Sequence, residues 1–204
     1  MGEIFEYMSN GGPIVVPILI CSIIALTISI ERYLSLRTDN IISTKLSSSI
    51  LHLLGKGELS AAEELVNTDQ SALGEVCRVI LQNKDKERSY ITKRTEEVAR
   101  QEGAKMERFL DVLSVIASIA PMLGLMGTVL GMVITFDAIQ MYGLGDIDSL
   151  AGGISQALLT TLAGLIVGVP TLISHRYFIA VVDGHLLKLE DFAIQVLELL
   201  EDGK

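Results

Sequence analysis

The sequence lacks tryptophan, contains few aromatic residues and leaves long segments without charge. Hydrophobic residues make up 50% of the 204 positions and concentrate in runs at 13–36, 112–136 and 150–174. Only the first run contains charged residues, Glu31 and Arg32. Each run exceeds the roughly 20 residues that cross a bilayer as a helix. An uncharged run of this length is unusual for the alternative, a buried helix of a soluble bundle. The composition therefore predicts an all-α membrane protein with transmembrane helices at 13–36, 111–136 and 150–174.

Catalytic signatures are also missing. There is no phosphate-binding GxxxxGK[ST], no GxSxG, no HExxH and no dinucleotide-binding fingerprint. His52, His175 and His185 have no metal-ligand spacing and are interpreted as ordinary surface or interfacial histidines. Cys21 and Cys77 are predicted to lie in different compartments, so they are interpreted as structural thiols that do not pair. We expect no enzyme activity, no metal and no cofactor.

Positive charge is absent from two parts of the chain. No Lys or Arg occurs at positions 1–30 or 109–175. By the positive-inside rule, 37–110 and 175–204 are predicted to be cytoplasmic, with 1–12 and 137–149 outside. The first run lacks preceding basic residues and ends in ERYLSLR, so we expect it to stay as a membrane helix. The net charge of −9, with acids and bases alternating on helix faces, is not a nucleic-acid-binding pattern.

The predicted cytoplasmic parts have helical periodicity. Ser60 and Glu63 form a capping-box pair that predicts a helix start. No turn signal interrupts the chain from Ser89 to Pro121, which predicts one helix of about 70 Å from Ser89 to Phe136. The third span continues beyond Arg176 with an amphipathic pattern. Two of the three spans should therefore extend into a cytoplasmic helical bundle.

Small and weakly polar residues recur along the second and third spans. Steps of three and four place them on one line of each helix: Ala117, Pro121, Gly124, Thr128, Gly131 and Thr135, then Ala157, Thr161, Gly164, Gly168 and Thr171. Such residues let membrane helices approach closely. The lines predict a tight seam between helices, or a wall that admits another helix, and both can hold. Pro121 and Pro170 each free a backbone carbonyl inside a span.

Ionisable residues are absent from the interior of these two spans. No Asp, Glu, Lys, Arg or His occurs at 112–136 or 150–174, where Gln156 is the strongest polar group. Membrane proton transfer usually requires a titratable group. If protons cross here, a partner must supply that group. Glu31 and Arg32 are interpreted as interfacial charges that pair or snorkel.

The segment APMLGLMGTVLGM followed by ISQALLTTLAGLIVGVP resembles the MotA/TolQ/ExbB proton channel family, and the span count resembles its ExbB/TolQ branch. The resemblance implies a homopentamer in the bacterial inner membrane, with the second and third spans lining a central pore. A single-span ExbD- or TolR-like partner would supply the membrane aspartate. The proton motive force would then energise a TonB- or TolA-like protein for outer-membrane transport or envelope maintenance.

The same resemblance suggests roles for individual residues. Thr128 and Thr161 match threonines that face the pore, and Gln156 stands where well-studied members have Glu. Thr160 is expected to face a neighbouring subunit. The predicted proton-pathway residues are thus Thr128, Thr161, Thr135, Gln156 and Thr160. The predicted pore wall comprises Gly124, Gly127, Gly131, Ala157, Gly164, Gly168, Pro121 and Pro170. The alternative is a passive oligomeric membrane scaffold without proton transport.

Overall fold

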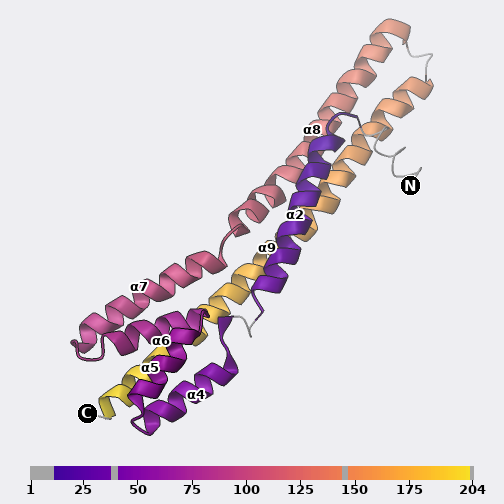
Figure 1. Cartoon of the computed structure of the whole chain (residues 1–204). Helices are drawn as coiled ribbons and strands as arrows, with labels where there is room; N and C mark the ends of the chain where they lie inside the picture. The colour runs from indigo at the N-terminus through magenta and orange to yellow at the C-terminus, as the bar shows by residue number, and fades with distance from the viewer. Residues whose placement is uncertain (1–11, 38–40, 144–146, 203–204) are drawn as a thin grey trace. The chain divides into compact units, whose positions relative to one another are not determined.

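The computed structural model describes residues 12–37, 41–143 and 147–202 (Figure 1). The predicted outer segment before residue 12, and residues 144–146 of the predicted outer loop, lie outside the described residues. The chain divides into two compact units. Unit 1 contains the chain up to Glu31 together with Phe109–Tyr177, and unit 2 contains Arg32–Arg108 and the chain from Phe178 onward.

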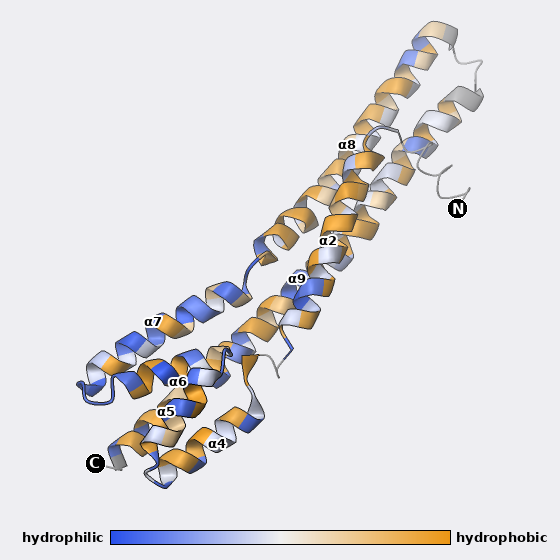
Figure 2. Ribbon diagram, in the orientation of Figure 1, coloured by the Kyte–Doolittle hydropathy of each residue, from blue (hydrophilic) through white to orange (hydrophobic). Residues whose placement is uncertain are grey.

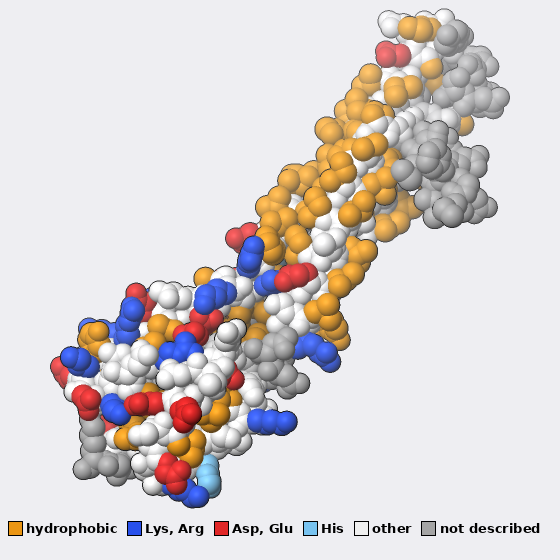
Figure 3. Space-filling model, viewed as in Figure 1, with side chains coloured by type: hydrophobic (Ala, Val, Ile, Leu, Met, Phe, Trp, Pro, Cys, Tyr) orange, Lys and Arg blue, Asp and Glu red, His pale blue; other side chains and the backbone are white. Residues whose placement is uncertain are grey.

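Unit 1 is built from three apolar helices, coloured mostly orange in Figure 2. They are most of α2 (Val15–Ser35), all of α8 (Leu110–Tyr142) and the first half of α9 (Ile147–Asp202). All three are long and apolar enough to cross a membrane. Large hydrophobic side chains cover the visible face of these helices in Figure 3, and many are exposed, among them Ile23, Leu125 and Leu158. An exposed apolar surface of this extent is that of a membrane protein, so the predicted fold class is confirmed.

Unit 2 is a bundle of amphipathic helices with charged outer faces (Figure 3). It comprises α4 (Thr44–Gly55), α5 (Leu59–Thr68), α6 (Ala72–Gln82), α7 (Arg88–Met106) and the second half of α9. Its core contains fully buried aliphatic side chains from several helices: Ile50, Leu73, Ile80, Val182, Leu189 and Val196. The amphipathic continuation of α9 beyond Arg176 is confirmed, because α9 runs unbroken to Asp202.

The predicted single helix from Ser89 to Phe136 is wrong, because α7 and α8 are separate helices. Helix α7 ends at Met106, and Phe109 before α8 adopts a left-handed backbone with φ 65°. A bulky residue with positive φ is strained, and it persists only where its surroundings impose it. One contact that holds this segment is a hydrogen bond from Arg32 Nη1 to the carbonyl of Met106 at 3.1 Å, which caps the end of α7. The break between α7 and α8 contains no Pro. The preceding glycine, Gly103, lies inside α7 and packs against Leu186 of α9, so it does not end the helix. The local sequence therefore does not indicate the break.

The predicted capping box at Ser60 is also wrong. Helix α5 begins at Leu59, and no side chain caps it. The reason lies in the end of α4, which closes with a Schellman motif. Gly57, at φ +77°, donates its N–H to Leu54 O at 3.0 Å, and the N–H of Glu58 bonds Leu53 O at 3.0 Å. This tight turn leads directly into α5, so Ser60 lies inside the helix.

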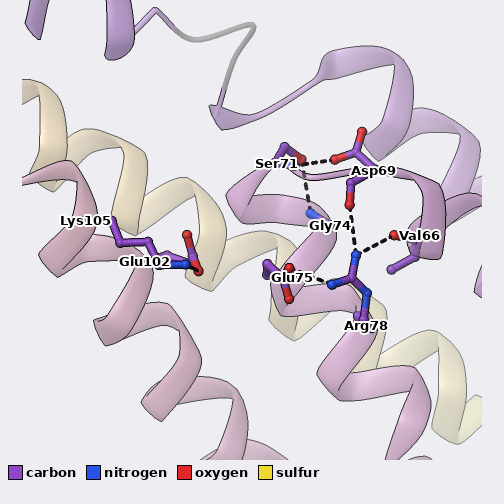
Figure 4. Close-up of polar contacts among 8 residues, drawn as sticks. All are labelled: Val66, Asp69, Ser71, Gly74, Glu75, Arg78, Glu102 and Lys105. Atoms are coloured by element: carbon purple, nitrogen blue, oxygen red, sulfur yellow. Dashed lines mark hydrogen bonds and ion pairs between the residues drawn. The ribbon is translucent and has the colours of Figure 1, made fainter.

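A side-chain brace joins α5 to α6 (Figure 4). Nη2 of Arg78 donates to two carbonyls at the end of α5, Val66 O at 3.0 Å and Asp69 O at 2.9 Å, and Nη1 pairs with Glu75 at 2.6 Å. Ser71 caps α6 by accepting the N–H of Gly74 at 3.2 Å. The brace satisfies the open carbonyls of one helix from the side chain of the next.

Cys77 is fully buried beside this brace. Burial, together with the nearby Asp69 carboxylate, raises the pKa of its thiol to about 12. Since the thiolate is the reactive form, the structural interpretation of this cysteine fits its environment.

We expect Cys77 to resist alkylation by iodoacetamide at pH 8 until the chain unfolds. The pKa is raised in the folded state, so the folding stabilisation from this group is complete below pH 9. It declines between pH 9 and 12 as the unfolded thiol ionises first, by up to about 1.4 kcal/mol per pH unit. Mass spectrometry of labelling in a Cys21→Ala background checks the first statement. Labelling of the folded protein at the rate of a free thiol would contradict it.

Candidate functional site

Helices α8 and α9 meet along what we call the small-residue seam. Contacts pair Gly131 with Ala157, Gly124 with Thr161 and Pro121 with Gly168, so the numbering falls on one helix as it rises on the other. The helices are therefore antiparallel. The seam consists of buried residues from α8 (Ala117, Ala120, Gly124, Gly127, Gly131 and Thr135) and from α9 (Gly153, Ala157, Thr160, Gly164, Gly168 and Thr171).

Backbone approaches backbone along this seam. A Cβ atom placed on Gly164 would lie 2.5 Å from the carbonyl oxygen of Ala120 and 3.0 Å from Cα of Gly124. On Gly131 it would lie 2.7 Å from Cβ of Ala157. Contacts this close require glycine, which is the packing that membrane helices use where hydrophobicity cannot drive association. The seam interpretation of the small-residue lines thus describes a contact within one chain.

The buried line differs from the predicted one by single residues. On α8 it passes through Ala120 and Gly127, whereas Pro121 and Thr128 lie at the edge and are part-exposed. On α9 it passes through Thr160, which is 1% exposed, and Thr161 lies at the edge. Cγ2 of Thr160 lies 2.3 Å from a Cβ placed on Gly127. The expectation that Thr160 faces a neighbouring subunit is therefore wrong, because its side chain fills the seam.

One threonine hydroxyl bridges the two helices. Oγ1 of Thr161 donates to the carbonyl of Gly124 at 3.0 Å. The hydroxyls of Thr128 and Thr135 donate within α8, to Leu125 O at 2.6 Å and Gly131 O at 2.8 Å, and that of Thr160 donates to Gln156 O at 2.8 Å. Each of these hydroxyl groups already donates its hydrogen bond. At the edge of the seam, the hydroxyl oxygens of Thr128 and Thr161 can therefore only accept a further hydrogen bond.

Thr128 and Thr161 lie on the same edge of the seam. Thr128 follows Gly127 and Thr161 follows Thr160, so each is turned in the same sense from the buried line of its own helix. Because the helices are antiparallel, these equal turns bring both side chains to one side. We call this side the hydroxyl edge.

Gln156 lies elsewhere. It is five residues from Thr161, about 140° around α9. Its Nε2 atom lies 2.3 Å from a Cβ placed on Gly12, which has φ +73° just before α2. Gln156 thus contacts the start of α2, and the hydroxyl edge is on the other side of the seam. A part for Gln156 in proton transfer stays a prediction.

The two prolines differ in their surroundings. Pro121 has no N–H for the carbonyl of Ala117, and that oxygen faces α9, 3.3 Å from a Cβ placed on Gly168. Close approach of Gly168 lets its Cα–H groups meet this carbonyl. Pro170, in contrast, is exposed on α9.

Sequence reasoning missed two buried polar residues in unit 2. Arg32, expected to pair or snorkel at the interface, is 5% exposed and bonds Met106. His185, expected to be a surface or interfacial histidine, is 4% exposed, and its Nε2 lies 3.0 Å from Leu36 O. The available signal was the periodicity of α9, in which His185 continues the buried positions Phe178 and Val182 at helical spacing. In the described part of the chain, no cluster of three His, Cys, Asp or Glu side chains is placed to hold a metal ion.

Comparison with known families gives the seam its context. The model of the MotA/TolQ/ExbB proton channel family matches residues 68–191, which include α6, α7, α8 and most of α9. The chain belongs to this family. In this MotA/TolQ/ExbB member, the whole small-residue seam and its hydroxyl edge lie inside the matched region.

Relatives of this family member come from diverse organisms. A biopolymer transport protein of Synechocystis, described as ExbB-like, is 29% identical over 186 residues, which are 87% of this chain and 71% of the relative. An ExbB homologue of Methanothermobacter thermautotrophicus is 29% identical over 190 residues, 93% of this chain and 67% of the relative. The biopolymer transport protein ExbB of Pseudomonas putida is 28% identical over 92% of this chain, but only 59% of the relative is covered. These similarities support an energy-transducing role in transport.

Proposed function

We propose that the chain is the proton-channel and motor subunit of an energy-transducing complex in the bacterial inner membrane. A single-span partner of the ExbD or TolR kind carries the membrane aspartate, which takes up and releases protons beside the hydroxyl edge. The resulting motion energises a TonB- or TolA-like protein. The N-terminus lies outside the cytoplasm and the C-terminal part of α9 lies inside, as the distribution of Lys and Arg favours.

The main support for this proposal is that the two helices that form the hydroxyl edge have no acidic residue within their predicted membrane spans. Thr128 and Thr161 present acceptor oxygens beside the contact between Gly124 and Thr161, yet no ionisable residue occurs at 112–136 or 150–174. An acceptor oxygen suits a protonated carboxyl group, which donates one hydrogen bond. A carboxyl group brought by another chain completes the set of groups that proton transfer needs.

Several copies of the chain surround that partner in this proposal, as a homopentamer. Large apolar side chains remain exposed on both helices of the seam, including Met122 and Leu125 on α8 and Leu162 and Leu165 on α9. Contact with lipid, with neighbouring copies and with the partner helix accounts for these surfaces.

Reconstitution tests the proposal. The chain is purified with its single-span partner, inserted into liposomes, and proton flux is measured under an imposed membrane potential with a pH-sensitive dye. We expect flux that depends on the partner and falls to background when the partner's membrane Asp is replaced by Asn. Subunits are counted in the same preparation. A complex that assembles fully but conducts no protons would favour the passive scaffold and overturn the proposal.

A further inference from the structure

A histidine lies on the same edge of α9 as Thr161. Thr161, Gly168 and His175 are spaced by seven residues. Each such step returns to nearly the same side of a helix with a drift of about 20°, so His175 lies within about 40° of Thr161 around α9. His175 therefore lies on this side, about 21 Å further along α9. It is the first ionisable residue met on α9 in that direction from Thr161.

The opposing helix contributes a matching line. Ser114, Pro121 and Thr128 are also seven residues apart. The contact between Pro121 and Gly168, at 2.6 Å from Cγ to a Cβ placed on the glycine, fixes the register of the two lines. One heptad beyond this contact, the antiparallel arrangement puts His175 level with Ser114. Both residues are part-buried, and the hydroxyl of Ser118 donates to Ser114 O at 3.1 Å.

The imidazole of His175 has an unusual environment. Among the residues that the structure describes, its buried Nδ1 atom has no hydrogen-bond partner, a condition that it shares with Nδ1 of His185 in unit 2. Buried polar atoms are nearly always bonded, so an exception calls for an explanation such as a catalytic role. The charged groups at this end of unit 1 are Asp111 on α8, Glu31 on α2 and Arg176 on α9 itself, and all three are exposed. His175 is thus the part-buried ionisable group between the hydroxyl edge and the charged end of the unit.

We propose that His175 is the proton-exchange residue at the charged end of the pathway, an inference that rests on the function proposed above. The neutral imidazole accepts at one ring nitrogen a proton that the partner's carboxyl group releases and that water carries over the roughly 21 Å between Thr161 and His175. It releases the proton of the other nitrogen to the aqueous side. Tautomer exchange then restores the starting state. One proton enters and one leaves, and no redox step occurs. Histidine suits this task because its charge changes near neutral pH.

The test uses the same liposomes and the full complex. His175→Gln should lower proton flux about tenfold or more. His52→Gln, at an exposed histidine of α4, is the matched control and should leave flux unchanged. In His175→Ala, added imidazole should restore flux. Wild-type flux in an assembled His175→Gln complex would overturn the inference.

Two further outcomes separate this inference from the proposed function. If the wild-type complex conducts no protons, the proposed function fails and the inference fails with it. If His175→Gln does not assemble, nitrogen-15 NMR of the three histidines in the wild-type complex decides. The His175 signal should change when the partner's Asp is replaced by Asn. A His175 signal that is the same in both complexes would overturn the inference.

Discussion

Gly164→Ala should clearly lower the thermal stability of the protein. The added methyl group would meet the carbonyl oxygen of Ala120 at 2.5 Å and backbone atoms of Gly124 at 3.0 and 3.1 Å. Backbone atoms cannot rotate away as a flexible side chain can, so α8 and α9 must separate along the seam. Overpacking of a tight contact typically costs about 1–3 kcal/mol, and separation of the helices also disrupts the hydrogen bond from Thr161 to Gly124.

The same helix offers matched controls for Gly164→Ala. Apart from the local helix backbone, no atom of the described residues lies within 4 Å of a Cβ placed on Gly152 or Gly184. Alanine at either position should be tolerated, and at Gly184 it should stabilise the helix by about 0.5–1 kcal/mol. Thermal unfolding in detergent, followed by size-exclusion chromatography, compares the three variants. Equal stability of Gly164→Ala and Gly152→Ala would show that the seam is looser than described.

Thr161→Val should strongly reduce proton flux while leaving the complex assembled. Valine keeps the shape of threonine but lacks the hydroxyl, so the bond to Gly124 and the acceptor oxygen are both lost. Hydrogen bonds between membrane helices contribute on average only about 0.6 kcal/mol, so assembly should survive. Loss of an acceptor beside the proton-carrying group should reduce flux about tenfold or more. Thr128→Val, on the same edge, should act in the same direction.

The neighbouring threonine provides the control for Thr161→Val. Thr160 has the same side chain one residue away, but it is buried in the seam and donates within α9 to Gln156. Thr160→Val should keep flux within about twofold of wild type, because the lost hydroxyl bonds within α9 and such bonds in membrane helices are weak. Thr161→Ser, which retains the hydroxyl, should restore most of the flux. Similar losses in Thr160→Val and Thr161→Val would contradict the assignment of the hydroxyl edge.

Periodicity and composition were sufficient to predict most of the features that lie within a single helix. The three apolar spans, the amphipathic continuation of α9 and the small-residue lines follow from local patterns that a single helix contains. The residues that form the buried line of the seam do not follow from such patterns. Ala120 and Pro121 are both small enough to be buried, and only contact with the facing helix decides which of them is. The same limit explains Ser60, whose place inside α5 follows from the turn that ends α4.

Buried polar contacts between distant segments were beyond sequence reasoning. Arg32 bonds Met106 and His185 lies beside Leu36, and both pairs are far apart in the chain. The break before α8 could not be predicted either, because Phe109 has a left-handed backbone and no neighbouring Gly or Pro indicates a helix end there. Such features depend on contacts that form only when the helices meet.

The continuity of α9 has a mechanical consequence. Its 56 residues form one helix through both units, whereas the chain leading into α8 is interrupted at Glu107–Phe109. A continuous helix is torsionally stiff, so a turn applied to α9 at the seam is carried along the axis to the residues that pack in unit 2. We therefore expect a helix-breaking substitution in α9 near Tyr177 to be felt in both units, because each unit contains part of this helix.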